Sequence, residues 1–166
     1  MLGTTHGSAG LFLGSLSGTA CGGGASGVIW GAAAGCVAGL LPDVDHPGSM
    51  AGRLCRPVSL YLEERWGHRD SPTHTVLFVL LAALPLAVIW LLLGCSAAPF
   101  WGAVTGGASH IALDAPTKSG VRPWRYIWFI PQKWRERLYR GKLETGSPLE
   151  WLLTAGFLAG TILLVM

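Results

Sequence analysis

The chain has 166 residues, of which 51% are hydrophobic and only 13% are charged, and its formal net charge is +3. Soluble domains carry roughly 25% charged residues, so this composition, with a mean hydropathy of +0.46, excludes an ordinary soluble globular protein. It indicates an integral membrane protein. No linker, repeat or change of composition divides the chain, so we expect residues 1–166 to form a single membrane-embedded domain.

The opening stretch, residues 2–41, contains no Asp, Glu, Lys or Arg and is rich in Gly, Ala and Ser. It is too long for one crossing, and the run Gly22–Gly24 is a natural break, so the sequence predicts a tight hairpin of two helices. Its glycines recur every four positions, which allows close helix contact in lipid, and a pore lining is the alternative. No basic segment precedes this stretch, so we expect it to stay in the mature protein.

Three further apolar blocks follow, at residues 75–98, 100–115 and 149–166. A helix needs about 20 apolar residues to cross a bilayer, so the first and third blocks predict conventional spans. The second is shorter and carries His110 and Asp114 at its end. Together with the hairpin, these blocks predict an all-α, polytopic transmembrane bundle with about five crossings.

Five crossings place the N-terminus and the loops 42–74 and 115–148 on one side of the membrane. All twelve Lys and Arg residues lie on that side, eight of them between Lys118 and Lys142. Because positive charge concentrates in cytoplasmic loops, we expect a multi-pass protein of the inner (plasma) membrane whose charged face is cytoplasmic.

The basic stretch from Pro131 to Arg140 interleaves cations with aromatic and apolar residues. This pattern predicts an interfacial amphipathic helix that lies on anionic lipid. Nucleic acid is the competing partner, but the modest net charge and the neighbouring apolar segments favour lipid headgroups. We therefore expect membrane lipid, and no nucleic acid, as a partner.

Histidine carries the main chemical signal. The chain has five histidines, and each lies in a short polar cluster that interrupts apolar sequence. Imidazoles and carboxylates are the usual ligands of zinc-class metals, and they are costly beside membrane-length segments unless they have a function. The four cysteines fall singly, without a C-x-x-C pair, and are interpreted as small apolar residues.

The spacing within the clusters favours convergence on a metal. Pro42 and Pro47 enclose the segment Asp43-Val44-Asp45-His46, whose two carboxylates would repel each other without a cation between them. His110 and Asp114 are four residues apart and share a helix face. The predicted ligands are His6, Asp43, Asp45, His46, His68, His74, His110 and Asp114. Helix capping by solvated loops is the alternative interpretation.

These motifs occur in a recognisable order: Thr-His near the N-terminus, LPDVDHPGS at 41–49, GHR at 67–69, THT at 73–75, SHIALDAPTKSGV at 109–121 and a late Glu150. The series resembles the membrane-bound metal-dependent hydrolases of the YdjM/YbcI type, also described as LexA-regulated inner-membrane hydrolases. The resemblance implies a polytopic helical inner-membrane protein with a divalent metal centre and hydrolase activity. It extends to Thr73, Thr117 and Glu150.

The leading hypothesis is hydrolysis of a phosphoester or related bond, in a lipid or lipid-linked substrate, by metal-activated water. Asp45 or Glu150 would take the proton and Arg69 would hold an anionic group. Zinc is the expected ion, with manganese or magnesium as alternatives. The predicted ligands exceed the three of a typical catalytic zinc, so either several ions bind or some residues orient others.

Two other classes of function remain open from the sequence. A divalent-metal transporter or metal-sensing membrane protein would also use histidines and carboxylates at membrane depth. An inert scaffold with histidines at helix ends is the third class.

Overall fold

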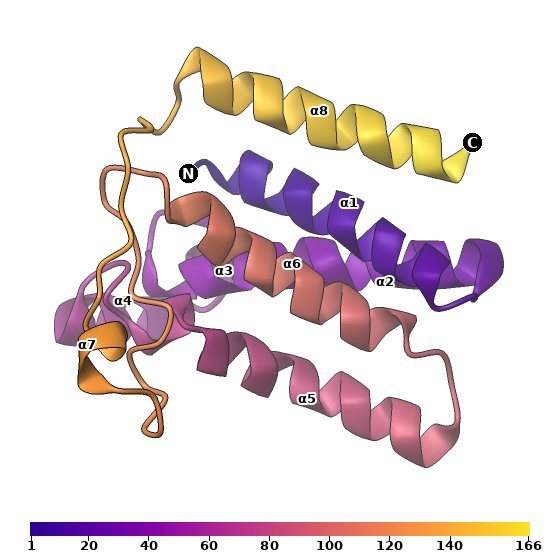
Figure 1. Ribbon diagram of the computed structural model, residues 1–166, viewed down its shortest axis with the longest axis horizontal. Helices are drawn as coiled ribbons and strands as arrows, with labels where there is room; N and C mark the ends of the chain where they lie inside the picture. The colour runs from indigo at the N-terminus through magenta and orange to yellow at the C-terminus, as the bar shows by residue number, and fades with distance from the viewer.

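The computed structural model describes residues 1–166, and the chain is all-helical with no strand. The chain has five long helices, which lie side by side (Figure 1). They are α1 (Gly3–Ala20), α2 (Gly24–Leu40), α5 (Val76–Leu93), α6 (Ala98–Asp114) and α8 (Pro148–Val165). The short helices gather at the end of the bundle where α1 begins: η1 (Leu41–Asp45), α3 (Met50–Leu54), α4 (Arg56–Trp66), η2 (Pro72–His74) and α7 (Gln132–Arg135).

The predicted hairpin is formed by α1 and α2, with the turn at the glycine run. Gly22 and Gly24 both have positive φ, at 68° and 56°, which glycine adopts without strain. A Cβ added at Gly14 would overlap the carbonyl group of Gly31, so only glycine permits this approach. Neighbouring backbone fills the space beside these glycines, which supports helix packing and argues against a pore.

The helix α6 completes a central layer with α1 and α2. A Cβ at Gly102 would overlap Gly31, and one at Gly106 would overlap Gly35, so α6 packs on α2 as closely as α1 does. The outer helices are α5, which packs mainly on α6, and α8, which packs on α1. Small residues thus give this bundle its close helix contacts.

The polarity of the bundle is inverted relative to a soluble protein. Large apolar side chains such as Leu80, Leu92 and Leu152 are exposed, while buried positions hold small and polar residues. An apolar outer surface is expected where lipid is the solvent. Three helical segments are long and apolar enough to span a membrane: Gly24–Asp45, Val76–Leu93 and Pro148–Val165.

The amphipathic helix predicted over residues 131–140 is wrong in extent, because only the single turn α7 forms. Beyond it the chain is extended, since Tyr139 and Val121 exchange two backbone hydrogen bonds of 2.9 Å. The Gly141 N–H also donates to the carbonyl of Thr117 at 3.0 Å. These long-range bonds compete with a local helix and prevail. Trp128 and Phe129 in the same region are exposed.

Candidate metal centre

The 3-10 helix η1 carries two of the predicted ligands at the end of α2. Pro42 lies in its first turn, where a missing N–H costs nothing, and Asp43 and Asp45 point inward and are buried. The Ser49 hydroxyl donates a 2.6 Å hydrogen bond to the Asp43 carbonyl and caps α3. This capping fixes the turn that aims both carboxylates into the protein.

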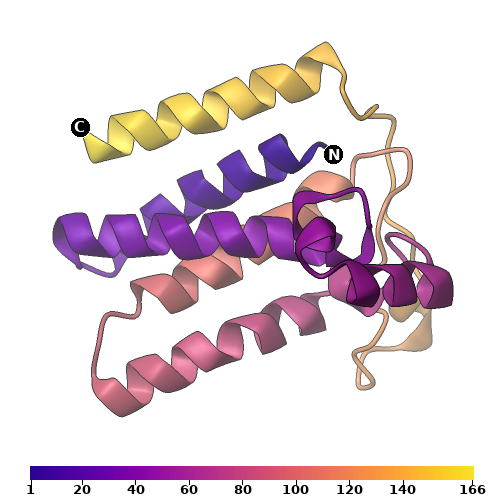
Figure 2. The same ribbon diagram turned by 180° about the vertical axis from the view of Figure 1, so that it is seen from behind.

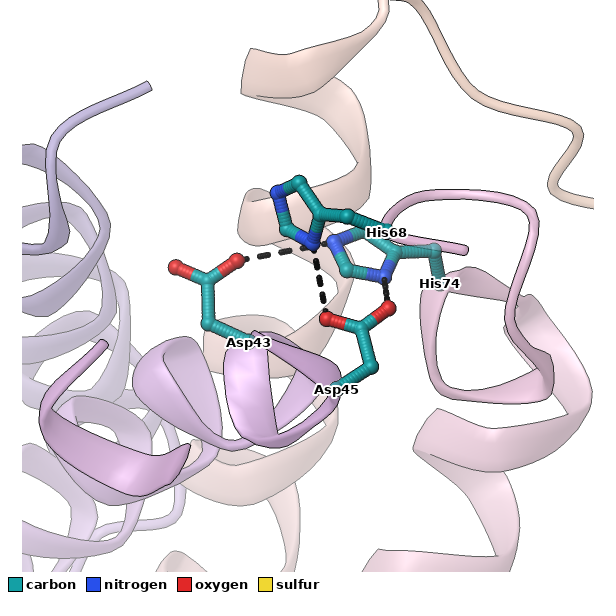
Figure 3. Close-up of side chains that lie close together, drawn as sticks. All are labelled: Asp43, Asp45, His68 and His74. Carbon is teal, nitrogen blue, oxygen red and sulfur yellow. Dashed lines mark hydrogen bonds and ion pairs between the residues drawn. The ribbon is translucent and has the colours of Figure 1, made fainter. Parts of the chain in front are cut away.

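Asp45 lies between two histidines, as Figure 3 shows. Its carboxylate is 2.8 Å from Nδ1 of His68 and 3.1 Å from Nδ1 of His74. It also accepts the backbone N–H of Arg69 at 3.3 Å. Because the carboxylate engages Nδ1 of His74, Nε2 of that ring is the nitrogen left to bind a metal. Nε2 of His68 accepts a hydrogen bond from Arg69 Nε at 3.3 Å.

A second group comes from the central helices. His6 on α1 and His110 and Asp114 on α6 are completely buried, and the two imidazoles stack with centroids 3.7 Å apart. Nδ1 of His110 is 2.7 Å from the carbonyl of Gly39, which again directs Nε2 inward. Neither ring nitrogen of His6 makes a hydrogen bond, although its Nε2 is 3.2 Å from Asp114 Oδ1. Such an orphaned buried group suits a metal ligand.

The two groups meet at four atoms: His74 Nε2, His110 Nε2, Asp43 Oδ1 and Asp114 Oδ2. The two imidazole nitrogens are 3.2 Å apart. His74 Nε2 lies 3.6 Å from the Asp43 oxygen and 3.7 Å from the Asp114 oxygen. The corresponding distances from His110 Nε2 are 3.5 and 3.3 Å. Ligand atoms that surround one zinc tetrahedrally at 2.0–2.2 Å lie about 3.3–3.6 Å from one another, so these five distances are compatible with a divalent ion between the two groups.

Two cations offset the buried carboxylate of Asp114. Arg69 forms an ion pair with Asp114, and the amino group of Met1 lies 2.8 Å from the same carboxylate. Arg69 is the one non-glycine residue with positive φ, at 73°. Such a conformation is uncommon for a side-chain-bearing residue and is frequent at functional sites.

The charge on His74 follows from the same surroundings. Burial alone would lower the pKa of His74, but the carboxylates of Asp43 and Asp45 outweigh it and raise the pKa to about 9. Without a metal, His74 therefore carries a proton at neutral pH. A metal that takes Nε2 as a ligand must displace that proton.

Two predicted residues lie outside the cluster. His46 is half-exposed and faces Glu63 of α4, at 3.4 Å from Nδ1 to the carboxylate. Glu150 is buried, and its carboxylate accepts hydrogen bonds from the Thr5 hydroxyl at 3.0 Å and from the backbone N–H of Leu2 and Gly146. Those contacts tie α8 to the start of α1 and leave the Glu150 carboxylate occupied.

Other residues of the motifs support the cluster without joining it. The Thr117 hydroxyl donates to the Asp114 carbonyl at 2.7 Å and so fixes the end of α6. The Thr73 hydroxyl lies 3.3 Å from Nδ1 of His74.

Two contributors were not predicted from the sequence. The Gly39 carbonyl, which orients His110, is a backbone group and has no signature in a sequence. Asp70 pairs with Arg122 and lies 3.5 Å from Arg125, which joins the histidine-bearing loop to the chain after α6. Asp70, Arg122 and Arg125 are visible in the sequence as charged residues, but which of them pair depends on the fold.

A cavity opens beside the buried cluster, at the end of the bundle where α1 begins. This cavity of about 640 Å³ is lined by Asp43, His46, His68 and Arg69, among others. It is large enough for a small ligand or a headgroup. The buried ligands thus have a polar entrance.

The model of the family described as YdjM inner membrane protein matches residues 1–165. The chain belongs to this family. The resemblance inferred from the motifs is therefore confirmed.

Individual relatives agree with the family match. The inner membrane protein YdjM of Escherichia coli (strain K12) is 37% identical over 115 residues, covering 67% of this chain and 54% of the relative, and YdjM of Shigella flexneri gives the same values. The uncharacterized protein YvsG of Bacillus subtilis (strain 168) is 34% identical over 125 residues, covering 75% and 71%. The chain thus spans about half the length of the YdjM relatives. No solved structure matches the chain.

Proposed function

We propose that this protein is a membrane-bound, metal-dependent hydrolase formed as one domain, and that it acts on a phosphoester or a lipid-linked substrate. The supporting observation is the spacing of the four inward-facing atoms of His74, His110, Asp43 and Asp114, at 3.2 to 3.7 Å for the pairs that include an imidazole. Two of these ligands are already oriented through their other ring nitrogen.

Two imidazoles and two carboxylates suit zinc, and manganese is the next candidate because it tolerates the same donors. Magnesium fits less well, since it prefers oxygen ligands. When bound, such an ion would lower the pKa of a water molecule and polarise the scissile group. His6, with its unsatisfied nitrogens beside Asp114, would complete the coordination or bind a second ion.

The residues at the cavity have distinct roles. The Arg69 guanidinium would hold an anionic group of the substrate, for which its planar fork is suited. His68 lines the cavity, and its Nδ1 contacts Asp45. Its Nε2 accepts a single hydrogen bond, from Arg69 Nε at 3.3 Å, so once Arg69 turns to a substrate anion this nitrogen would take the proton from the attacking water. This assignment replaces Asp45 and Glu150 as the base, because three donors engage each of those carboxylates.

The bundle is proposed to cross the inner membrane five times with the cluster at the cytoplasmic face. The support is that all five long helices are aligned, and that every Lys and Arg belongs to the segments at the cluster end (Figure 1). Relatives named inner membrane proteins agree with this location.

A metal transporter is less well supported. Away from the cluster, α1, α2, α5 and α6 carry no ionisable side chain other than cysteine, and the buried polar groups there are hydroxyls such as Ser15. A divalent ion would find no charged ligand along such a path.

The test uses detergent-purified protein, stripped of metal with a chelator and then reloaded with zinc, manganese or magnesium. We expect hydrolysis of bis(p-nitrophenyl) phosphate or of phosphatidic acid to be lost on stripping and restored by one of the ions. His74→Ala should be inactive, and Cys95→Ser, in the turn between α5 and α6 at the other end of the bundle, should be active. Activity that survives both stripping and His74→Ala would contradict the proposal, as would uptake of the ion into proteoliposomes without hydrolysis.

A further inference from the structure

A second hollow in the molecule lies within the bundle rather than at its end. Because α5 packs on α6 and only slightly on α2, a groove of about 350 Å³ remains between these three helices. In Figure 2, α6 lies between and behind α2 and α5. The groove is lined by twelve hydrophobic residues, two prolines and one glycine.

The shape of the groove comes from small side chains. Small residues line it on all three helices: Ala34 and Ala38 on α2, Ala82 on α5 and Ala103 on α6. The indole N–H of Trp30 is the one polar side-chain group in the lining, and one donor is too few to hold an ordered water. The chemistry of the groove therefore favours hydrocarbon.

The lining of the groove includes residues that are close in sequence to three of the candidate ligands. Pro42 immediately precedes Asp43 in η1, Phe78 lies four residues after His74, which belongs to η2 just before α5, and Gly107 lies one turn before His110 on α6. A molecule whose apolar part fills the groove therefore places its polar end next to three of the four candidate ligands. This continuity distinguishes the groove from the rest of the lipid-facing surface.

The length of the groove matches one leaflet. It runs along α2 from Trp30 to Leu41, which at 1.5 Å per residue is about 16 Å. The hydrocarbon core of a bilayer is about 30 Å thick, so the groove extends over roughly half of it. A single chain of a lipid in the leaflet next to the cluster has this extent.

We propose that the groove between α2, α5 and α6 binds one hydrocarbon chain of a membrane lipid and delivers the headgroup linkage of that lipid to the metal centre. This inference rests on the proposed function and names its substrate class, a lipid phosphoester that enters sideways from the bilayer. An acyl chain and an isoprenoid chain share the required chemistry.

Binding of the lipid chain can be tested by photocrosslinking, whether or not the protein hydrolyses the lipid. The wild-type protein is reconstituted in vesicles that contain phosphatidic acid with a photoreactive diazirine in its acyl chain, and the crosslinked residues are mapped by mass spectrometry. We expect crosslinks to concentrate on 30–41, 78–86 and 99–107. An excess of a polyprenyl phosphate or of unlabelled phosphatidic acid should suppress them, and glycerol phosphate should not. The stronger lipid competitor identifies the chain class.

Variants that fill the groove sharpen the test. Ala34→Phe and Ala82→Phe block it from opposite walls, and Ala155→Phe places the same side chain on the exposed surface of α8. We expect each groove variant to lower crosslinking about tenfold, since the added ring takes up space that the lipid chain would fill and overpacking is destabilising. Ala155→Phe should crosslink like wild type, and all three should retain wild-type metal content.

The outcomes separate the two proposals. Hydrolysis of phosphatidic acid should fall with crosslinking in the groove variants, while hydrolysis of bis(p-nitrophenyl) phosphate should not change. Crosslinks spread evenly over all lipid-facing helices, or unaffected by both groove variants, would contradict the proposal that the groove binds a lipid chain. Crosslinks confined to the groove without hydrolysis of any phosphoester would instead support lipid binding in the groove and contradict the proposed hydrolase activity.

Discussion

The Asp45 carboxylate orients two of the candidate histidines through single polar contacts. One carboxylate fixes the rings of two histidines, 2.8 Å from His68 and 3.1 Å from His74, and so determines which nitrogen of each is available. Carboxylate–histidine pairs of this kind orient a ligand ring and raise its basicity. The proposed metal site would therefore depend on a residue that need not touch the metal.

Asp45→Asn keeps the size of the side chain but removes its charge. We expect metal affinity to fall about 10–100-fold, which is the usual effect of losing such a partner. Competition with a fluorescent zinc chelator measures it. His46→Ala is the control and should bind with wild-type affinity, because His46 faces Glu63 outside the cluster. An Asp45→Asn protein with unchanged affinity would show that Asp45 has no orienting role.

The charge of His74 makes metal binding depend on pH. The pKa of His74 is raised to about 9 without metal, so a proton occupies the ring at every pH below that value. Affinity should rise as pH increases from 6 to 9, by up to about tenfold per unit for one displaced proton, and level off above 9. Chelator competition across this range tests it, and a flat profile would contradict the assignment of His74 as a ligand.

At the scale of helices, the glycines on α1 decide how closely the hairpin packs. Gly14→Ala should lower the free energy of unfolding by about 1–3 kcal/mol, because the added methyl group overlaps the Gly31 carbonyl. Gly156→Ala on α8 is the matched control, since a Cβ there meets nothing within 4 Å. It should leave stability unchanged or raise it, as alanine favours a helix over glycine. If Gly14→Ala and Gly156→Ala changed the free energy of unfolding equally in a denaturant titration, close packing at Gly14 would be contradicted.

The helices were largely predictable because apolar length and glycine breaks are local properties. The hairpin turn at Gly22–Gly24 and the long helices followed from them. The basic stretch did not follow, because the bonds between Val121 and Tyr139 come from distant parts of the chain. For the same reason the sequence named the candidate ligands but could not separate His46 and Glu150 from those that converge. Which polar residues meet is decided by packing.

At the scale of the whole molecule, the native cysteines offer a test of topology. Cys55 lies between α3 and α4 at the cluster end, Cys95 lies in the turn between α5 and α6 at the other end, and both are exposed. We expect a membrane-impermeant maleimide to label Cys95 from outside intact spheroplasts and Cys55 only in inverted vesicles.

A third position tests the first crossing. Thr4 is exposed near the start of α1, so Thr4→Cys, in a protein whose native cysteines are replaced by serine, should label like Cys55. Labelling of position 4 from the side of Cys95 would exclude five crossings and would remove His6 from the cluster.

The metal content of the purified protein tests the central claim most directly. Elemental analysis is done on detergent-purified wild type, on the cluster variants Asp43→Ala and His110→Ala, and on the control His46→Ala. Each protein is first checked for a monodisperse peak in size-exclusion chromatography. The account predicts at least one zinc or manganese per chain in wild type and His46→Ala, and almost none in Asp43→Ala and His110→Ala. Wild type that purifies without metal and binds none when zinc is added, or cluster variants that retain a full complement, would contradict it.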